Sequence, residues 1–155
     1  MSLEAIWDAV ARQSGTVTGI KGAYATRAGG QGTTVRAFPD DIADGPVAVI
    51  DYAGSELLNV APFERIAHDF DIALWHPLRP GTRSTAVQVL APMFERFAVA
   101  FRNNVGLYGT AHMAVIQGST GFADEELNDK DFLVQRIQLR AQEARTVTAA
   151  IGPSS

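Results

Sequence analysis

The hydrophobic pattern changes its period near the middle of the chain, between residues 62 and 102. From Ile66 to Leu74 every second residue is apolar or histidine, which is typical of a strand with one buried face. The predicted buried side carries Ile66, His68, Phe70, Ile72 and Leu74, and the opposite side carries Arg65, Ala67, Asp69, Asp71 and Ala73. After the Pro-containing turn at 76–81, an apolar stripe with a period of about 3.6 residues predicts a helix. Its members are Ala86, Leu90, Met93, Phe94, Phe97 and Phe101.

A short turn joins this strand and helix, so we expect them to pack face to face. Pro92 lies inside the helical pattern and predicts a kink or break, because proline removes a backbone donor and crowds the preceding turn.

The flanking segments predict a helix over 3–13 anchored by Trp7, and a connection over 17–24 that pairs as a short strand. Further strands are predicted at 34–38, 46–51, 55–60 and 110–116. Residues 26–33 and the acidic stretch 119–131 read as loops. Residues 132–145 fit both a strand and a helix, and we favour the strand because a preceding strand and turn invite a hairpin partner. The pattern predicts one α+β domain over 1–145, with a mixed, mostly antiparallel sheet covered on one face by a long and a short helix, and a flexible tail over 146–155.

Composition narrows the class of protein. The chain has 155 residues, no cysteine and a formal net charge of −4. These values fit a soluble globular domain and exclude disulfides, thiol nucleophiles and cysteine-based zinc sites. The acidic balance argues against a surface that grips nucleic acid. No stretch predicts a membrane span, and the first residues lack the basic start of a signal peptide, so we expect an intracellular chain.

Candidate chemistry is sparse. His68 and His112 fall on predicted strands and could join Asp69 or Asp71 in a metal site, but ligand spacing is lacking and Asp69 and Asp71 point away from His68. Structural, hydrogen-bonded histidines are the favoured reading. The glycines at 29–32 lack the lysine and following helix of a phosphate loop. The acidic run 124–131 lacks the calcium-loop register, and no serine lies in a nucleophile elbow. No catalytic set, metal or cofactor is predicted.

The order of elements resembles a known family of virion proteins. The resemblance is carried by the runs from Leu3 to Val10, Val17 to Tyr24, Val35 to Ile42, Gly45 to Val49, Phe63 to Trp75 and Leu90 to Phe97. Together with the proline-glycine turn after Trp75, this order resembles the tail terminator (tail completion, minor tail) proteins of long-tailed bacteriophages and related phage-tail-like particles. It covers roughly residues 3–145 and rests on pattern and order, without an invariant motif.

The resemblance implies a structural protein with an α+β fold that acts in virion assembly. Family members form a homohexameric ring that caps the tail tube, ends tube polymerisation and presents a surface to the head–tail connector. The implied partners are therefore a second copy of the chain, the tail tube protein and a connector or stopper protein. Genome DNA would pass through the lumen without specific binding, which agrees with the acidic charge balance. The implied location is the head-proximal end of the tail, with assembly in the host cytoplasm and no membrane partner.

Two further functions stay open on the sequence. One is a head–tail connector or stopper protein of the neck. The other, from a different class, is a small α+β enzyme or ligand-binding domain that uses His68 and His112. For a ring, we expect basic side chains of one subunit to face acidic ones of the next. The predicted interface residues are Arg79, Arg83, Arg96, Asp124, Glu125 and Glu126.

Overall fold

Five strands and three helices make up the described part of the chain. The computed structural model describes residues 2–26, 45–60 and 63–146. The chain order is α1 (Leu3–Gly15), β1 (Gly22–Ala25), β2 (Val47–Val60), β3 (Phe63–Pro77), α2 (Arg83–Leu90), α3 (Met93–Arg102), β4 (Met113–Leu127) and β5 (Lys130–Thr146). The predicted strand at 34–38, the predicted loop at 26–33 apart from Thr26 and the predicted tail at 146–155 apart from Thr146 lie outside these residues.

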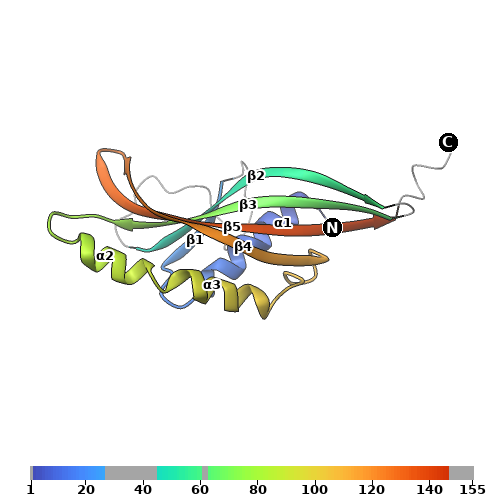
Figure 1. Cartoon of the computed structure of the whole chain (residues 1–155), viewed down its shortest axis with the longest axis horizontal. Coiled ribbons are helices and arrows are strands. Elements are labelled where there is room, and N and C mark those ends of the chain that lie inside the picture. Colours follow the sequence, from blue (N-terminus) through green and yellow to red (C-terminus); the bar gives the residue numbers. More distant parts are fainter. Residues whose placement is uncertain (1, 27–44, 61–62, 147–155) are drawn as a thin grey trace.

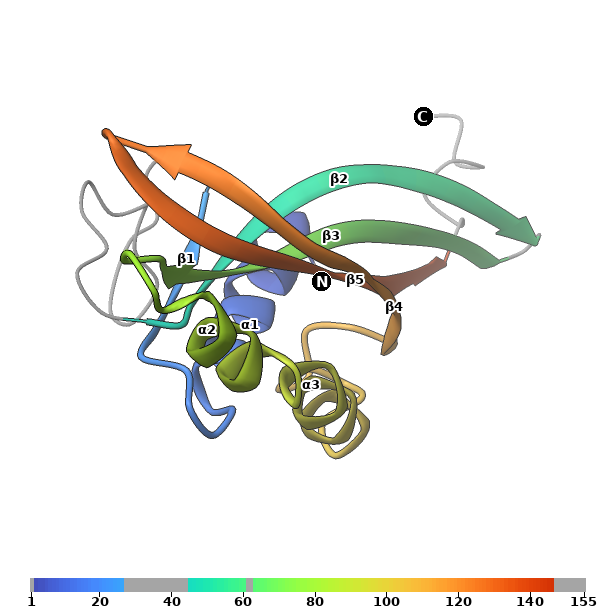
Figure 2. The same cartoon turned by 60° about the vertical axis from the view of Figure 1, so that its left-hand side comes forward.

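The strands form one mixed sheet in the order β1-β2-β3-β5-β4. β1 runs parallel to β2, while the pairs β2–β3, β3–β5 and β5–β4 are all antiparallel. The α+β class, the mostly antiparallel sheet and the strand at 132–145 are therefore confirmed. The helices lie together on one side of the sheet, which we name the inner face, and the opposite side is the outer face (Figure 2).

The main core lies between the helices and the inner face. Phe70, Ile72 and Leu74 of β3 are buried there, and Trp7 of α1 donates its indole N–H to the carbonyl oxygen of Ile50 at 2.8 Å. The buried helical residues are Ala86, Leu90, Met93, Phe97 and Phe101, while Phe94 is half-buried. The predicted packing of strand against helix is confirmed.

Pro92 divides the predicted long helix into α2 and α3, as expected from its missing N–H. Both pieces keep their apolar stripe toward one core, because the break lets the helical layer follow the curved sheet (Figure 1). The ends of β2, β3 and β5 extend beyond these helices in both views.

Two boundary predictions are wrong. The expected strands 46–51 and 55–60 are one strand, β2, because a bulge between Tyr52 and Gly54 absorbs an extra residue without ending the pairing. The expected loop 119–131 is the second half of β4, a tight turn and the start of β5. Asn128 and Asp129 form that turn with φ of 52° and 63°, the left-handed conformation that a two-residue hairpin requires.

The outer face is also less exposed than the alternation in β3 predicts. Ala67 and Ala73, expected on a solvent side, are buried. A second, smaller cluster covers one end of this face, formed by Val47, Val49, Ala73, Trp75, Phe132 and Val134, with Tyr24 and Leu127 packed against it. Tyr24 belongs to β1 and Leu127 to the tip of the β4–β5 hairpin, so residues distant in sequence bury this end.

Candidate assembly surface

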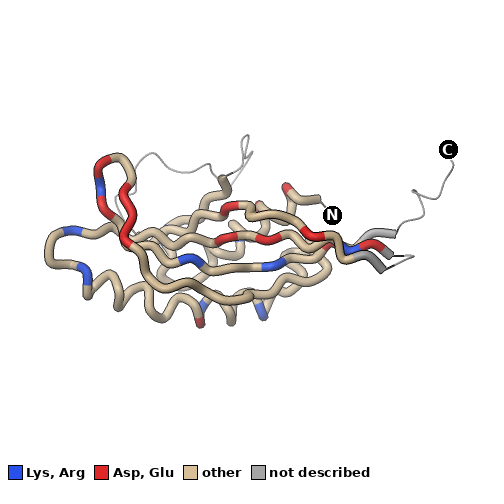
Figure 3. Tube along the Cα trace, turned by 45° about the horizontal axis from the view of Figure 1, so that its top comes forward, with Lys and Arg blue, Asp and Glu red and all other residues tan. Residues whose placement is uncertain are grey.

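Charged residues gather along the middle of the neighbouring strands β2, β3 and β5 (Figure 3). Arg140 of β5 makes a two-pronged contact with Asp69 of β3, at 2.8 Å from Nε to Oδ1 and 3.0 Å from Nη2 to Oδ2. The same guanidinium lies 3.0 Å from Oε2 of Glu56 on β2. Hydrogen bonds to Asp69 and then to Glu56 raise the pKa of Arg140. One arginine therefore links three strands.

A second arginine repeats this arrangement on the other side of β5. Arg136 contacts both carboxylate oxygens of Glu125 on β4, with Nη2 and Oε1 separated by 3.1 Å. The hydrogen bond to Glu125 raises the pKa of Arg136, and the charges of Asp71 and Asp51 act in the same direction. In the middle of the outer face, carboxylates of β2 and β3 thus surround two arginines of β5, and the four carboxylates are Asp51, Glu56, Asp69 and Asp71.

The six predicted interface residues do not form one patch. Arg83 and Asp124 form an exposed ion pair within the same chain, with 57% and 63% of their side chains accessible. Glu125 is held by Arg136, also within the chain. Two of the acidic side chains expected to face a neighbour are therefore already compensated inside one molecule.

Of the remaining three, Arg79 and Glu126 both lie near the tip of the β4–β5 hairpin, and Arg96 lies on α3. Arg79 lines a cavity of about 370 Å³ that also contains Asp129 and Asp131 of the hairpin tip. Glu126 is exposed and directly opposite Asp131 in the β4–β5 pair. Arg96 lies on α3, where its Nη1 donates to the carbonyl oxygen of Thr18 at 3.2 Å.

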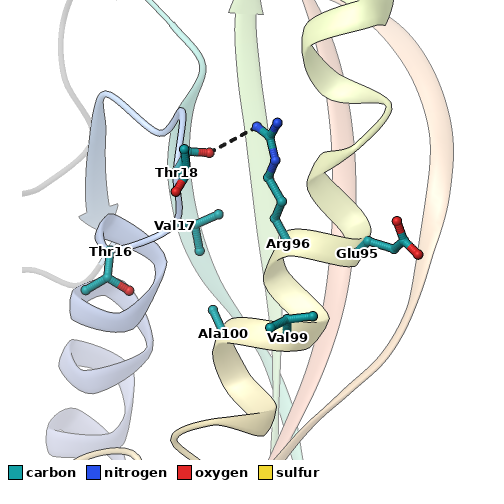
Figure 4. A pocket seen from close by; sticks show the side chains of 7 residues that line it. All are labelled: Thr16, Val17, Thr18, Glu95, Arg96, Val99 and Ala100. Atoms are coloured by element: carbon teal, nitrogen blue, oxygen red, sulfur yellow. Dashed lines mark hydrogen bonds between the residues drawn. The ribbon is translucent and has the colours of Figure 1, made fainter.

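Arg96 belongs to a shallow groove between α3 and the segment after α1 (Figure 4). Its volume is about 610 Å³, and it is lined by Thr16, Val17, Thr18, Glu95, Arg96, Val99 and Ala100. Val17, Val99 and Ala100 are its apolar side chains, and the Arg96 side chain extends toward Thr18 while the Glu95 carboxylate points away from Arg96 (Figure 4). No nucleophile, base and acid converge in this lining, so the groove offers contact area without a chemical step.

His68 occupies the site that most resembles a catalytic group. Its Nδ1 lies 2.6 Å from Oγ of Ser55 and its Nε2 lies 3.0 Å from Oε2 of Glu143. His68 and Glu143 are buried, with 5% and 3% of each residue accessible, and the Tyr52 hydroxyl also contacts Ser55 Oγ. Neither of the two cavities above is lined by these residues. The prediction of a hydrogen-bonded histidine is confirmed for His68.

The other histidines stand apart from this network. His76 on β3 is hydrogen-bonded through Nδ1 to the carbonyl oxygen of Pro77 at 2.9 Å, and His112 is exposed just before β4. Asp69 and Asp71 lie on the outer face, away from His68, as the alternation predicts. Within residues 2–26, 45–60 and 63–146, no group of three or more His, Asp or Glu side chains is arranged to hold a metal ion.

Sequence reasoning missed Ser55, Glu143, Arg136 and Arg140. Ser55 and Glu143 meet His68 only through strand pairing, which no local pattern reveals. The arginines carried a usable signal, because Arg136, Gln138 and Arg140 occupy alternate positions of one strand, as Asp69 and Asp71 do on another. Two polar ladders of opposite charge predict neighbouring strands.

The sheet also has unpaired edges on its two opposite sides. β1 pairs only with Val47 to Ile50, and no other described strand lies beside the rest of β2. On the far side β4 is the last strand, and no described strand pairs with it beyond β5, although the N–H of Ala114 is bonded to the carbonyl oxygen of Val105. Unpaired edges present backbone donors and acceptors to other chains.

No protein-family model matches the chain, and no curated protein matches it significantly. None of the helices in the described ranges is long and apolar enough to cross a membrane.

Proposed function

We propose that this protein is a structural subunit of a ring that caps the tail tube of a long-tailed phage or a phage-tail-like particle. The two open edges on opposite sides of the sheet carry this proposal, together with the resemblance in element order. Such edges form a heterologous pair of surfaces, and identical subunits joined through heterologous surfaces close into a ring when the rotation permits.

The outer face supports a role around a channel. On this face Arg136 forms an ion pair with Glu125, and Arg140 forms ion pairs with Asp69 and Glu56. A channel for DNA must not retain phosphate groups, and binding phosphate requires clustered lysine and arginine that are free to contact it. Here both arginines are already engaged by carboxylates, so this face is suited to line a lumen.

The proposal is tested by assembly with tail tubes. Native mass spectrometry of the purified protein is expected to show a closed ring, with a hexamer as the expected size, and electron microscopy is expected to show it at one end of tubes assembled from tail tube protein. Tubes polymerised with the ring present should be shorter than those without it. A monomer that neither binds tubes nor limits their growth would falsify the proposal.

A connector or stopper protein of the neck is the second candidate of the same class. The open edges serve such a ring equally well, so the binding partner decides between the two. If the ring binds portal-side adaptor protein and ignores tail tubes, the neck function replaces the terminator function.

The observation that favours an enzyme is the contact of His68 with an exposed serine and a buried glutamate. Alanine substitution of His68 and His112, with metal analysis of the purified protein, separates this reading from a structural one. If no metal copurifies and both variants lose only stability, the enzyme function is excluded.

A further inference from the structure

The free edge of β2 begins where β1 ends, and its backbone groups can be oriented from one contact. The carbonyl oxygen of Ile50 accepts from the N–H of Thr26 at 3.1 Å and therefore points away from β3. In antiparallel pairs, residues alternate between facing the partner and facing away. Ile50 lies opposite Ile72, and Leu57 lies opposite Ile66, which has the same phase along β3. Leu57 therefore also directs its backbone groups to the open side.

The free edge of β4 has the same phase. The N–H of Ala114 donates to the carbonyl oxygen of Val105 at 2.8 Å, so it points away from β5. Ile116, two residues further along a regular stretch, directs its backbone groups to the open side as well. The side chains of Ala114 and Ile116 lie on the inner face, because they are paired with Ala141 and Leu139.

Both edges therefore direct backbone groups of inner-face residues outward. On β4 the N–H of Ala114 is already bonded to Val105, which leaves the carbonyl group of Ala114 and both backbone groups of Ile116. Two antiparallel strands exchange paired hydrogen bonds when opposite residues both face the partner. In the register of the sheet, Ile116 of β4 lies opposite Leu139 of β5, which lies opposite Phe70 of β3, which lies opposite Tyr52 of β2. A neighbour's β2 can thus continue the sheet beside β4 without turning its side chains to the wrong face.

The directions of the two edge strands also allow antiparallel pairing between copies. β2, β3, β5 and β4 alternate in direction across the sheet, so the two edge strands run opposite ways. Rotation about an axis along the strands keeps these directions, and β4 of one copy then meets β2 of the next in antiparallel orientation. Because the number of alternating strands between the two edges is even, every junction between copies in a ring is antiparallel.

The side chains at both edges are apolar and exposed. Leu57 is 58% and Tyr52 is 37% accessible on β2, and Val115 is 42% accessible on β4. Residues 113–123 of β4 contain no charged residue and no proline. Soluble monomers usually protect a free edge with such residues. Register shifts after Ile116 and after Ser119 leave Met113 to Ile116 as the regular part of this edge.

The free edge of β2 is held in place by the buried histidine. Ser55 lies on this edge, and its hydroxyl contacts His68 of β3, which contacts Glu143 of β5. The chain of contacts anchors β2 at Ser55 to the two neighbouring strands β3 and β5. A fixed edge loses less conformational entropy when another strand pairs with it.

From these observations we propose that subunits join by antiparallel pairing of β4, through the carbonyl group of Ala114 and both backbone groups of Ile116, with β2 of the next copy, from Tyr52 to Leu58. This inference rests on the proposed ring and names its interface. The stagger between copies sets which residues meet, because closing a sheet into a ring requires tilted strands.

Cysteine cross-linking tests this pairing directly, because the chain contains no cysteine of its own. V115C is combined with E56C or with L58C, which all lie on the outer face. A disulfide requires Cα atoms roughly 4.4–6.8 Å apart. Within one chain, β5 and β3 separate these positions. Only a neighbouring copy can supply the partner, so oxidation should give a ladder of covalent oligomers that ends at the ring size.

The matched control combines V115C with L57C, which lies on the inner face. This pair should remain largely monomeric on a non-reducing gel, as should each single variant. Equal cross-linking of all three pairs, or cross-linking of none, would contradict the interface.

A proline substitution gives an independent test. L57P removes an N–H that points to the open side, so β2 keeps its bonds to β3. Native mass spectrometry should show loss of the ring for L57P and its retention for L57A, with similar thermal unfolding. L58P removes an N–H that faces β3 and should lower the unfolding temperature. A ring that persists in a folded L57P protein would overturn the proposal.

The two proposals fail separately. If rings form and the outer-face pairs cross-link but tubes are not capped, the interface stands and the terminator function falls. If tubes are capped but no pair cross-links, the function stands and another surface forms the ring.

Discussion

His68 of β3 is buried and connects three neighbouring strands through Ser55 of β2 and Glu143 of β5. It lies between a partly exposed serine and a buried carboxylate, with Glu143 only 3% accessible. A buried carboxylate depends on its partners, because it has lost its hydration. The residue types match those of a nucleophilic triad, while their position in the sheet indicates a brace for β2.

We predict that His68→Leu destabilises the chain by about 2–4 kcal/mol, because it removes one partner of a buried polar pair. Urea unfolding followed by circular dichroism measures the change. The double variant His68→Leu with Glu143→Leu is the control and should recover much of the loss, since no buried carboxylate remains. A small loss in the single variant would show that Glu143 does not depend on His68.

The ion pairs of the outer-face arginines should contribute to stability in a way that changes only at high pH. The pKa values of Arg136 and Arg140 are raised by their carboxylate partners. A group whose pKa is higher in the folded state contributes its stability below its unfolded pKa and loses it as the pH rises through its folded pKa. For arginine this window lies far above neutrality, so these pairs should keep their contribution between about pH 7 and pH 10.

At the scale of single elements, α3 shows how one helix divides its faces. Met93, Phe97 and Phe101 point into the core, and the rings of Phe97 and Phe101 stack with their centroids 6.2 Å apart. Val99, between them in sequence, is 49% accessible and lines the groove beside α1.

We expect Phe97→Ala to cost about 3–5 kcal/mol, as is typical when a large buried side chain leaves a cavity. Val99→Ala is the matched control on the opposite face and should change stability by no more than about 0.5 kcal/mol. Chemical denaturation of both variants measures the difference. Similar losses in the two would contradict the orientation of α3.

The β4–β5 hairpin is the element that the sequence analysis predicted as a loop, because residues 124–131 are rich in acidic side chains. Its tip holds Asn128 and Asp129 at positive φ, between the paired residues Leu127 and Lys130. Glycine adopts this conformation freely, whereas a β-branched residue is strained in it.

Asp129→Gly should therefore keep or raise stability by up to about 1 kcal/mol, and Asp129→Val should lower it by about 1–2 kcal/mol. Thermal unfolding of the two variants reports both effects. If valine is tolerated as well as glycine, the tip does not have a two-residue left-handed turn.

At the scale of the whole molecule, the described part of the chain has a helical layer, an outer face with charged residues at its centre, and two edges along which no further described strand pairs. The basic and acidic residues first assigned to contacts between subunits include one pair, Arg83 and Asp124, that meets within the chain. Exposed ion pairs contribute little to folding, usually below about 1 kcal/mol. Arg79 and Arg83 therefore remain useful probes of the ring.

Changing both Arg79 and Arg83 to glutamate should weaken the ring by charge repulsion and change the unfolding free energy by no more than about 1 kcal/mol. Native mass spectrometry at low and moderate salt measures ring content, and the effect should shrink as salt rises. The exchange of Arg83→Glu with Asp124→Arg is the control, because it restores the pair inside the chain. A ring that survives both arginine changes refutes a role for these residues between subunits.

Local pattern by itself determined most elements of this protein. The alternation in β3, the stripe of α2 and α3, the break at Pro92 and the anchoring Trp7 depend on neighbours within a few residues, and each is found where the sequence predicts it. The α+β class followed from the same local periods.

Only the tertiary structure decided how these elements are joined and which surfaces are free. The bulge that makes β2 one strand, the pairing that extends β4 to Leu127 and the meeting of Ser55, His68 and Glu143 all arise from contacts between residues distant in sequence. The acidic side chains of 119–127 led to the prediction of a loop. In the structure, Arg83 of α2 and Arg136 of β5 pair with Asp124 and Glu125, and these partners are distant in sequence. The free edges are likewise a property of strand order, which the hydrophobic period of one segment does not encode.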